Sequence, residues 1–193
     1  MVPKPTDKQT LPIMKRYLYL IPVLLLCFTQ CKETVTNTAS KQETFYDKGQ
    51  AVFYGAYYQP EGIQHNVLSL DIYSPNLSLD STNHIVGTGV NIYLSDIFLP
   101  TTDTFLVATT YTADTTTADY TFLPGMNYDG QISGAYILNI TDGSLVSAEL
   151  FQEGTFNLTQ KGDSTFIEFL LTKESGKKYA AEFRGVLPYY DGR

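Results

Sequence analysis

Asn66–Tyr73 reads N-V-L-S-L-D-I-Y, and this stretch decides the fold class because apolar and polar residues alternate along it. Leu68, Leu70 and Ile72 lie two residues apart, so in an extended chain their side chains share one face. The residues between them point to the opposite face. This alternation predicts a β-strand with one buried face and one solvated face.

The same pattern recurs along most of the chain, and no stretch has a convincing helical period. Gly89–Phe98 alternates in the same way and then changes register at Asp96–Ile97, which predicts a β-bulge. The other candidate strands bring the total to about ten; they are Ala51–Tyr58, Thr104–Thr112, Tyr120–Leu123, Gln131–Ile140, Leu145–Leu150, Gly154–Gln160, Thr165–Leu171 and Lys178–Leu187.

Turn residues separate these strands. Asp142-Gly143 and Lys161-Gly162-Asp163 favour the positive φ that tight hairpins need, and Glu174–Lys177 suits a slightly longer turn. The second half of the chain therefore reads as a meander. We expect an all-β fold, an antiparallel sandwich or calycin-like barrel of about 8–10 strands.

The segment Met14–Cys31 has the composition of an export signal. Two basic residues precede an apolar run, Tyr17–Phe28, that is too short to cross a bilayer as a permanent helix. The ending F-T-Q-C resembles the bacterial lipobox, although Gln30 stands where a small residue is usual. We expect Cys31 to carry the lipid; an ordinary cleaved signal followed by a coincidental cysteine is the alternative.

The chain divides into four segments on this interpretation. Residues 1–13 precede the signal and suggest a mis-called start, 14–30 form the lipoprotein signal peptide, 31–43 form a polar tether, and 44–193 form a single β domain. Removing residues 1–31 from the 193 leaves 162, which is enough for one domain with its own core.

Composition excludes several classes of function. The leader contains four of the thirteen basic residues and one of the twenty acidic ones, so the mature chain has a net charge near −10. Such a surface opposes nucleic acid, and any attachment to a membrane has to come from the lipid. Both cysteines, Cys27 and Cys31, lie in the leader, so we expect neither a disulfide framework nor a thiolate metal site in the domain.

Several pieces of the domain occur in a recognisable order: V-F-Y-G-A-Y-Y (52–58), N-I-Y-L-S-D-I-F (91–98), G-T-F-N-L-T-Q-K-G-D (154–163) and S-G-K-K-Y-A-A-E-F-R-G-V-L (175–187). This order resembles a group of Bacteroidetes lipoproteins of unassigned activity. The resemblance covers most of the mature chain and implies a secreted antiparallel β domain. The resemblance does not imply a catalytic activity.

No catalytic set is visible in the sequence. His65 and His84 fall in predicted loops without a neighbouring nucleophile, and we interpret them as solvated. The scarcity of histidine also argues against a zinc site. The loop residues Asp114, Asp119 and Asp129 could offer oxygen ligands, but their spacing does not match a calcium-binding loop. A glycosidase pair could be drawn from the carboxylates on predicted strands, which are Asp71, Asp96, Glu149, Glu168 and Glu182. We expect no catalytic residues, no metal and no cofactor.

Tyrosine pairs give the best candidate ligand site. Tyr57 and Tyr58 end the first predicted strand, and Tyr189 and Tyr190 follow the last one. Exposed rings in such places can stack on sugar rings, although tyrosines also commonly cap the open ends of a barrel core. Both interpretations stay open at this point.

The sequence therefore favours a lipid-anchored domain of the bacterial outer membrane, acting as a non-enzymatic accessory or binding protein. Its expected partners are the membrane, through the lipid, and either an oligosaccharide or another envelope protein, but not nucleic acid. The alternatives are a surface glycan-binding module that uses the four tyrosines and, more weakly, a carboxylate-dependent hydrolase. The sequence leaves open whether the anchored domain is exposed at the cell surface or faces the periplasm.

Overall fold

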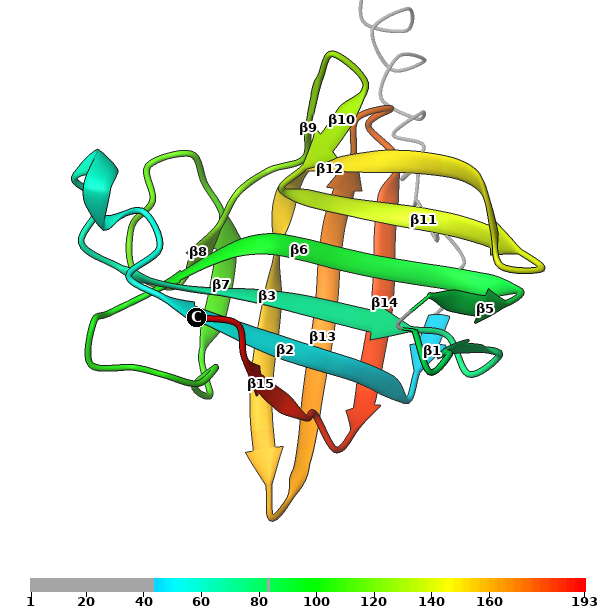
Figure 1. Ribbon diagram of the computed structural model, residues 1–193, viewed down its shortest axis with the longest axis horizontal. Coiled ribbons are helices and arrows are strands. Elements are labelled where there is room, and N and C mark those ends of the chain that lie inside the picture. Colours follow the sequence, from blue (N-terminus) through cyan, green and yellow to red (C-terminus); the bar gives the residue numbers. More distant parts are fainter. Residues whose placement is uncertain (1–43, 83) are drawn as a thin grey trace, which may run out of the picture. The chain divides into compact units, whose positions relative to one another are not determined.

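A computed structural model describes residues 44–82 and 84–193, and these residues form strands with one short 3₁₀ helix at Gln59–Glu61 (Figure 1). In chain order the strands are β1 (Thr44–Tyr46), β2 (Lys48–Gly55), β3 (Asn66–Tyr73), β4 (Leu77–Leu79), β5 (Ile85–Gly87), β6 (Gly89–Leu99), β7 (Thr110–Ala113), β8 (Thr121–Phe122), β9 (Met126–Tyr128), β10 (Gln131–Ser133), β11 (Ala135–Thr141), β12 (Ser144–Lys161), β13 (Ser164–Lys173), β14 (Lys178–Gly185) and β15 (Tyr189–Asp191).

Eleven strands form one sheet that closes on itself. Its order is β1-β14-β13-β12-β7-β8-β6-β3-β2-β15, and β11 pairs with both β12 and β6. Strands β6, β11, β12, β7 and β8 therefore make a ring of paired strands. In Figure 1, β2, β3, β6 and β11 run across β12, β13 and β14, so the closed sheet has two crossing layers. The expected all-β fold, a sandwich or barrel, is confirmed as a barrel-like core with extra strands.

Pairing within the described residues is antiparallel except for three pairs. β1 pairs in parallel with β14, β15 with β2, and β7 with β8. The two terminal strands have three residues each. They bring backbone partners to the outer strands β14 and β2 and so shorten the unpaired edges, which in a sheet invite association with other chains.

Strand β12 is one continuous strand of 18 residues, whereas the sequence pattern had predicted two strands with a break between them. Its first part pairs with β11, and its second part pairs with β13 and β7. The register shifts between Phe151 and Glu153, next to Gly154, whose φ is 129°. This bulge turns β12 from one layer into the other, and in the sequence it interrupts the alternation that marks a strand.

The bulge predicted in Gly89–Phe98 is confirmed. Leu68 of β3 pairs with Ile97 of β6, while Leu70 pairs with Leu94. Two residues of β6, Ser95 and Asp96, therefore lie opposite the single residue between the two leucines.

The predicted hairpin turns also form. Asp142 and Gly143 have φ values of 50° and 74° between β11 and β12, and Gly162 and Gly176 have φ values of 59° and 79° in the next two turns. Several strand predictions were too long. The strand predicted over Ala51–Tyr58 ends at Gly55, so Tyr57 and Tyr58 lie in the turn after β2. Thr104–Thr112 is extended only from Thr110, and Gln131–Ile140 is divided into β10 and β11 at Gly134.

Side chains fill the interior of the barrel. Tyr111 stacks on Phe156 with ring centroids 4.4 Å apart, and Phe122 and Phe169 contact the other sides of Phe156. These four rings are at most 1% exposed. Burying large aromatic and aliphatic side chains is the main source of stability in a domain whose residues 44–193 contain no cysteine.

The described residues belong to one compact unit, Lys41–Arg193. Within this part of the chain no helix is long and apolar enough to span a bilayer. The predicted signal peptide, the predicted lipidation site Cys31 and the whole predicted tether, 31–43, lie outside the described residues.

Candidate functional site

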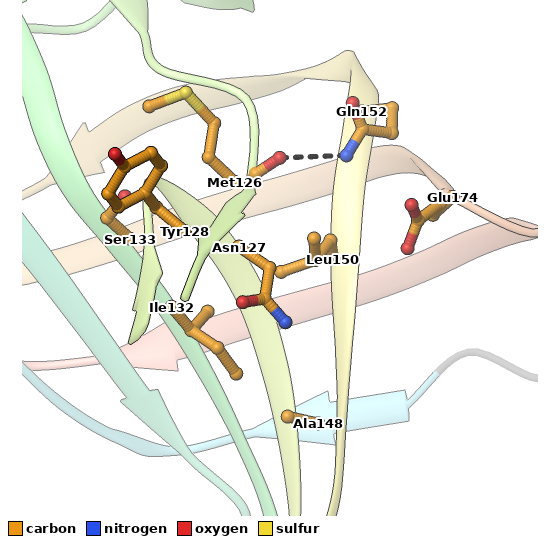
Figure 2. A pocket seen from close by; sticks show the side chains of 10 residues that line it. Met126, Asn127, Tyr128, Ile132, Ser133, Ala148, Leu150, Gln152 and Glu174 are labelled. Atoms are coloured by element: carbon orange, nitrogen blue, oxygen red, sulfur yellow. Dashed lines mark hydrogen bonds between the residues drawn. The ribbon is translucent and has the colours of Figure 1, made fainter. Parts of the chain in front are cut away.

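A β-hairpin made of β9 and β10 extends from one end of the barrel and forms one wall of a pocket (Figures 1 and 2). Its turn is Asp129-Gly130, with φ values of 50° and 84°, which suit a two-residue hairpin loop. Both strands are largely exposed: the Tyr128 side chain is 79% exposed and Met126 is 48% exposed. The hairpin therefore carries large apolar side chains into solvent, away from the core.

Two glycines form the neck of this hairpin. Gly134 has a φ of 75°, and a Cβ there would lie 2.0 Å from the carbonyl oxygen of Pro124. A Cβ on Gly125 would lie 2.3 Å from the carbonyl oxygen of Ala135. The two strands leave the barrel so close together that neither position has room for a side chain.

The opposite wall of the pocket is the bulge of β12, where two carbonyl groups bind neighbouring loops. The Gly125 amide donates to the Phe151 carbonyl at 2.7 Å, and the Glu174 amide donates to the Leu150 carbonyl at 2.9 Å. The side chain of Gln152 also donates from Nε2 to the Gly125 carbonyl at 2.8 Å. The bulge thus fixes both the hairpin neck and the turn after β13.

The space between these walls, called the hairpin pocket below, has a volume of about 740 Å³. Figure 2 shows its lining side chains, which come from β9, β10, β12 and the turn after β13. The lining combines aromatic, aliphatic, amide, hydroxyl and carboxylate groups; its residues are Gly125, Met126, Asn127, Tyr128, Ile132, Ser133, Ala148, Leu150, Gln152 and Glu174. This mixture of an apolar surface and a few polar groups is typical of small-molecule sites.

Glu174 is the one charged residue among those that line the hairpin pocket. The adjacent Lys173 is directed elsewhere: its Nζ lies 2.6 Å from Glu149 Oε1, and its side chain is only 11% exposed. The pocket therefore presents a weakly negative surface.

The first predicted tyrosine pair is used within the fold. Tyr58 Oη donates to Asp96 Oδ1 at 2.7 Å, and burial together with this carboxylate raises the pKa of Tyr58. Tyr57 is 61% exposed, and its ring meets that of Tyr58 edge-on with centroids 4.9 Å apart. Neither tyrosine lines the hairpin pocket.

The second predicted pair lines a different pocket, of about 340 Å³, called the C-terminal pocket below. Tyr189 and Tyr190 lie in β15, and Phe105 meets Tyr189 edge-on with centroids 5.0 Å apart. Tyr189 Oη accepts a hydrogen bond from the Leu106 amide at 3.2 Å, and burial raises the pKa of Tyr189 to about 12. Tyr190 is 54% exposed and free to stack on a ligand. The two tyrosine pairs do not share a pocket.

Two carboxylates considered from sequence, Glu168 and Glu182, lie opposite each other on β13 and β14 and line one pocket with Arg184. Glu182 pairs with Arg184 at 2.6 Å. The side chain of His84 is 81% exposed, as expected for a solvated histidine, whereas that of His65 is only 25% exposed. His65 Nδ1 is buried 3.0 Å from Asp119 Oδ1 without forming a hydrogen bond of good geometry, so His65 is half-buried rather than solvated. Among residues 44–82 and 84–193, no group of three or more His, Cys, Asp or Glu is arranged to hold a metal ion.

Asp71 is the carboxylate with the most unusual surroundings. It is half-buried on the outer side of β3 and accepts hydrogen bonds from the Tyr73 hydroxyl and the Asn91 side-chain amide. Burial raises the pKa of Asp71, although these hydrogen bonds oppose the shift. No second carboxylate is among its hydrogen-bond partners in the described part of the chain.

Reasoning from the sequence missed the hairpin pocket, although a signal for it was present. Asp129-Gly130 is the dipeptide that favours a two-residue hairpin, and Gly125 and Gly134 flank it symmetrically. The expectation of a single strand over Gln131–Ile140 concealed this hairpin. Gln152 and Glu174 carry no signal of their own, because only the bulge of β12 brings them to the pocket.

No protein-family model, curated protein or solved structure matches this chain. The geometry of the site is therefore the basis for the function proposed below.

Proposed function

We propose that this protein is a lipid-anchored binding protein of the bacterial outer membrane, without enzymatic activity, and that its ligand binds in the hairpin pocket. The observation that carries the proposal is the contrast between a filled barrel and an open pocket outside it. The largest core rings are at most 1% exposed, whereas the pocket wall carries a tyrosine that is 79% exposed.

The filled interior favours binding at the surface over binding inside the barrel. Barrels that carry small apolar ligands hold them in a central cavity, whereas smaller barrels are filled by their own side chains. Here Tyr111, Phe156 and Phe169 occupy the centre. A ligand thus has to approach from outside, and the hairpin pocket is a preformed place for it.

The arrangement of carboxylates supports binding without catalysis. General acid–base hydrolysis of a glycoside needs two carboxyl groups that flank one bond. The hairpin pocket contributes one carboxylate, Glu174, and the nearby Glu149 is held by Lys173.

Attachment to the membrane is tested by the variant Cys31→Ser. If Cys31 carries the lipid, the variant leaves the membrane fraction, and metabolic labelling with a fatty acid is lost. Cys27→Ser is the matched control and keeps both properties. A Cys31→Ser protein that stays labelled in the membrane fraction contradicts the proposal.

Binding is tested by thermal unfolding of the full chain, purified in a detergent without a sugar headgroup, against oligosaccharides, peptides and lipids. A ligand at a hundred times its dissociation constant adds about 2.7 kcal/mol to the stability of the native state. We expect one class to raise the midpoint in the wild type but not in Tyr128→Ala. If no class raises it, binding in this pocket is wrong.

The C-terminal pocket supports a second candidate, a glycan site built on the tyrosines predicted from sequence. Tyr190 is 54% exposed there, beside Phe105, which is 57% exposed. The variant Tyr190→Ala separates the two sites: it abolishes binding at the C-terminal pocket and leaves the hairpin pocket unchanged.

A further inference from the structure

We infer that the ligand of the hairpin pocket is a neutral oligosaccharide, bound with one sugar ring against Tyr128 and its hydroxyl groups on the side chains of Asn127, Gln152 and Glu174. This inference rests on the proposed function and names the ligand class for the same site. Four properties of the pocket support it: its charge, its free hydrogen-bonding groups, its apolar surface and its open position.

The charge of the pocket excludes anionic ligands. Its lining includes one carboxylate, Glu174, and no lysine, arginine or histidine. A phosphate, sulfate or uronate group placed here would meet a negative side chain without a cation to balance it. A neutral ligand meets no such penalty.

Two amide side chains are already oriented, and each leaves one free group. Asn127 Oδ1 accepts from the Gly130 amide at 3.0 Å, which leaves Nδ2 free to donate. Gln152 Nε2 donates to the Gly125 carbonyl at 2.8 Å, which leaves Oε1 free to accept. Because these groups are held before the ligand arrives, binding does not require their ordering.

The free groups form a mixed set: a donor on Asn127, an acceptor on Gln152 and a carboxylate acceptor on Glu174. A sugar hydroxyl both donates and accepts, so neighbouring hydroxyls can satisfy all three groups. The ammonium group of a cationic ligand only donates, so it would satisfy Glu174 but not the donating amide of Asn127.

The apolar surface of the pocket suits the C–H face of a sugar ring. Tyr128 projects from the hairpin with 79% of its surface exposed, and Met126, 48% exposed, lies on the same strand. Figure 2 shows the Tyr128 ring beside Ser133, directed away from Gln152 and Glu174, whereas Asn127 and Ile132 are directed toward Leu150. Because side chains alternate along β9, Tyr128 and Met126 project from one face of the hairpin and Asn127 from the other. The oligosaccharide therefore crosses the edge of β9, with one ring on Tyr128 and the hydroxyl groups of its neighbouring rings at the polar groups.

The test is calorimetric titration of the full chain in a detergent without a sugar headgroup. The probes are maltohexaose, xylohexaose, mannohexaose and chitohexaose as neutral chains, hexagalacturonate as an anionic chain, and pentalysine as a cation. The variants are Tyr128→Ala, which removes the exposed ring, and Glu174→Gln, which removes the charge but keeps an acceptor. Tyr190→Ala, in the C-terminal pocket, is the matched control.

We expect at least one neutral hexaose to bind, with affinity lowered about tenfold or more in Tyr128→Ala and unchanged in Tyr190→Ala. Glu174→Gln keeps most of this affinity, because the new amide still accepts a hydrogen bond. Tyr128 lies on the surface, so the Tyr128→Ala protein folds normally and its loss of affinity reports on the site.

Three results overturn the inference. Binding of pentalysine but no hexaose, lost in Glu174→Gln, means a cationic ligand; the inference then fails, but the proposed binding function stands. Hexaose binding that is lost in Tyr190→Ala and kept in Tyr128→Ala moves the site to the C-terminal pocket. If no hexaose binds, the inference fails, and if in addition no peptide or lipid raises the unfolding midpoint, the proposed function fails with it.

Discussion

Tyr111 and Tyr128 are both aromatic residues of short strands, yet they lie in opposite environments. Tyr111 is 0% exposed and stacks on Phe156 with an interplanar angle of 10°, while Tyr128 is 79% exposed on the hairpin. The strand of Tyr111 pairs within the closed sheet, whereas the strand of Tyr128 pairs only with β10. Composition alone therefore does not separate core tyrosines from binding tyrosines; the topology does.

This difference predicts that the barrel interior determines stability and that the hairpin pocket determines binding. Changes inside the barrel should lower the free energy of unfolding strongly. Changes on the pocket surface should leave it almost unchanged and act on ligand affinity. The following predictions test this division, from the largest expected effect on stability to the smallest.

Phe156→Ala should have the largest effect. The ring of Phe156 contacts Tyr111, Phe122 and Phe169, so its removal leaves a cavity in the centre of the barrel. We expect the free energy of unfolding to fall by about 3–5 kcal/mol in urea titrations. A loss below about 1 kcal/mol would mean that the barrel centre is not tightly packed.

Gly134→Ala should destabilise the neck of the hairpin by about 1–3 kcal/mol. A Cβ would lie 2.0 Å from the Pro124 carbonyl oxygen, and φ is 75°. Gly130→Ala is the matched control: its φ is also positive, 84°, but a Cβ there meets nothing within 4 Å. If the two variants lose equal stability in urea, the close approach at the neck is wrong.

Asp71→Asn should change how stability depends on pH. Burial raises the pKa of Asp71 in the folded state, so between the ordinary aspartate pKa and this raised value the folded protein binds more protons than the unfolded chain. The contribution of Asp71 to stability therefore falls as pH rises through this window. It is unaffected at lower pH, where both states are protonated.

The measurement compares unfolding midpoints of the wild type and Asp71→Asn from about pH 3 to pH 8. Relative to the variant, the wild type should lose stability as pH rises above the ordinary aspartate pKa. A relative gain over the same range would show that the hydrogen bonds from Tyr73 and Asn91 outweigh burial.

Tyr128→Ala should have the smallest effect on stability. Its ring is mostly in solvent, so the free energy of unfolding should change by no more than about 0.5 kcal/mol. The same variant should nevertheless lose the rise in midpoint that a ligand causes. Loss of stability comparable to that of Phe156→Ala would remove the distinction between core and pocket.

Much of the fold could be predicted from local sequence. The alternation in Asn66–Tyr73 and the Asp142-Gly143 turn are local features, and the structure confirms the strand and the turn. The solvated face predicted for this strand is wrong, because Ser69 and Tyr73 on that face are at most 5% exposed. Bulges were harder to interpret. In β6 the alternation of apolar and polar residues continues beyond the bulge with a shift in register. In β12 the bulge interrupts the alternation, so the sequence of this one strand reads as two strands.

The site could be predicted only in part, because it depends on contacts between segments distant in the chain. Tyr189 and Tyr190 were identified from sequence and do line a pocket, but their partner Phe105 lies far from them in sequence. The hairpin pocket brings Tyr128 and Glu174 together through the hydrogen bonds of the β12 bulge. No local pattern records such a contact.

The most direct test of the central claim uses Met126, the one methionine of the chain after residue 14. In protein labelled with ¹³C-methyl methionine, the Met126 methyl reports on the hairpin pocket during titration with the ligand that raises the unfolding midpoint. We predict a saturable shift of this resonance in the wild type and none in Tyr128→Ala. A ligand that raises the midpoint but leaves the Met126 resonance in place would show that binding occurs elsewhere.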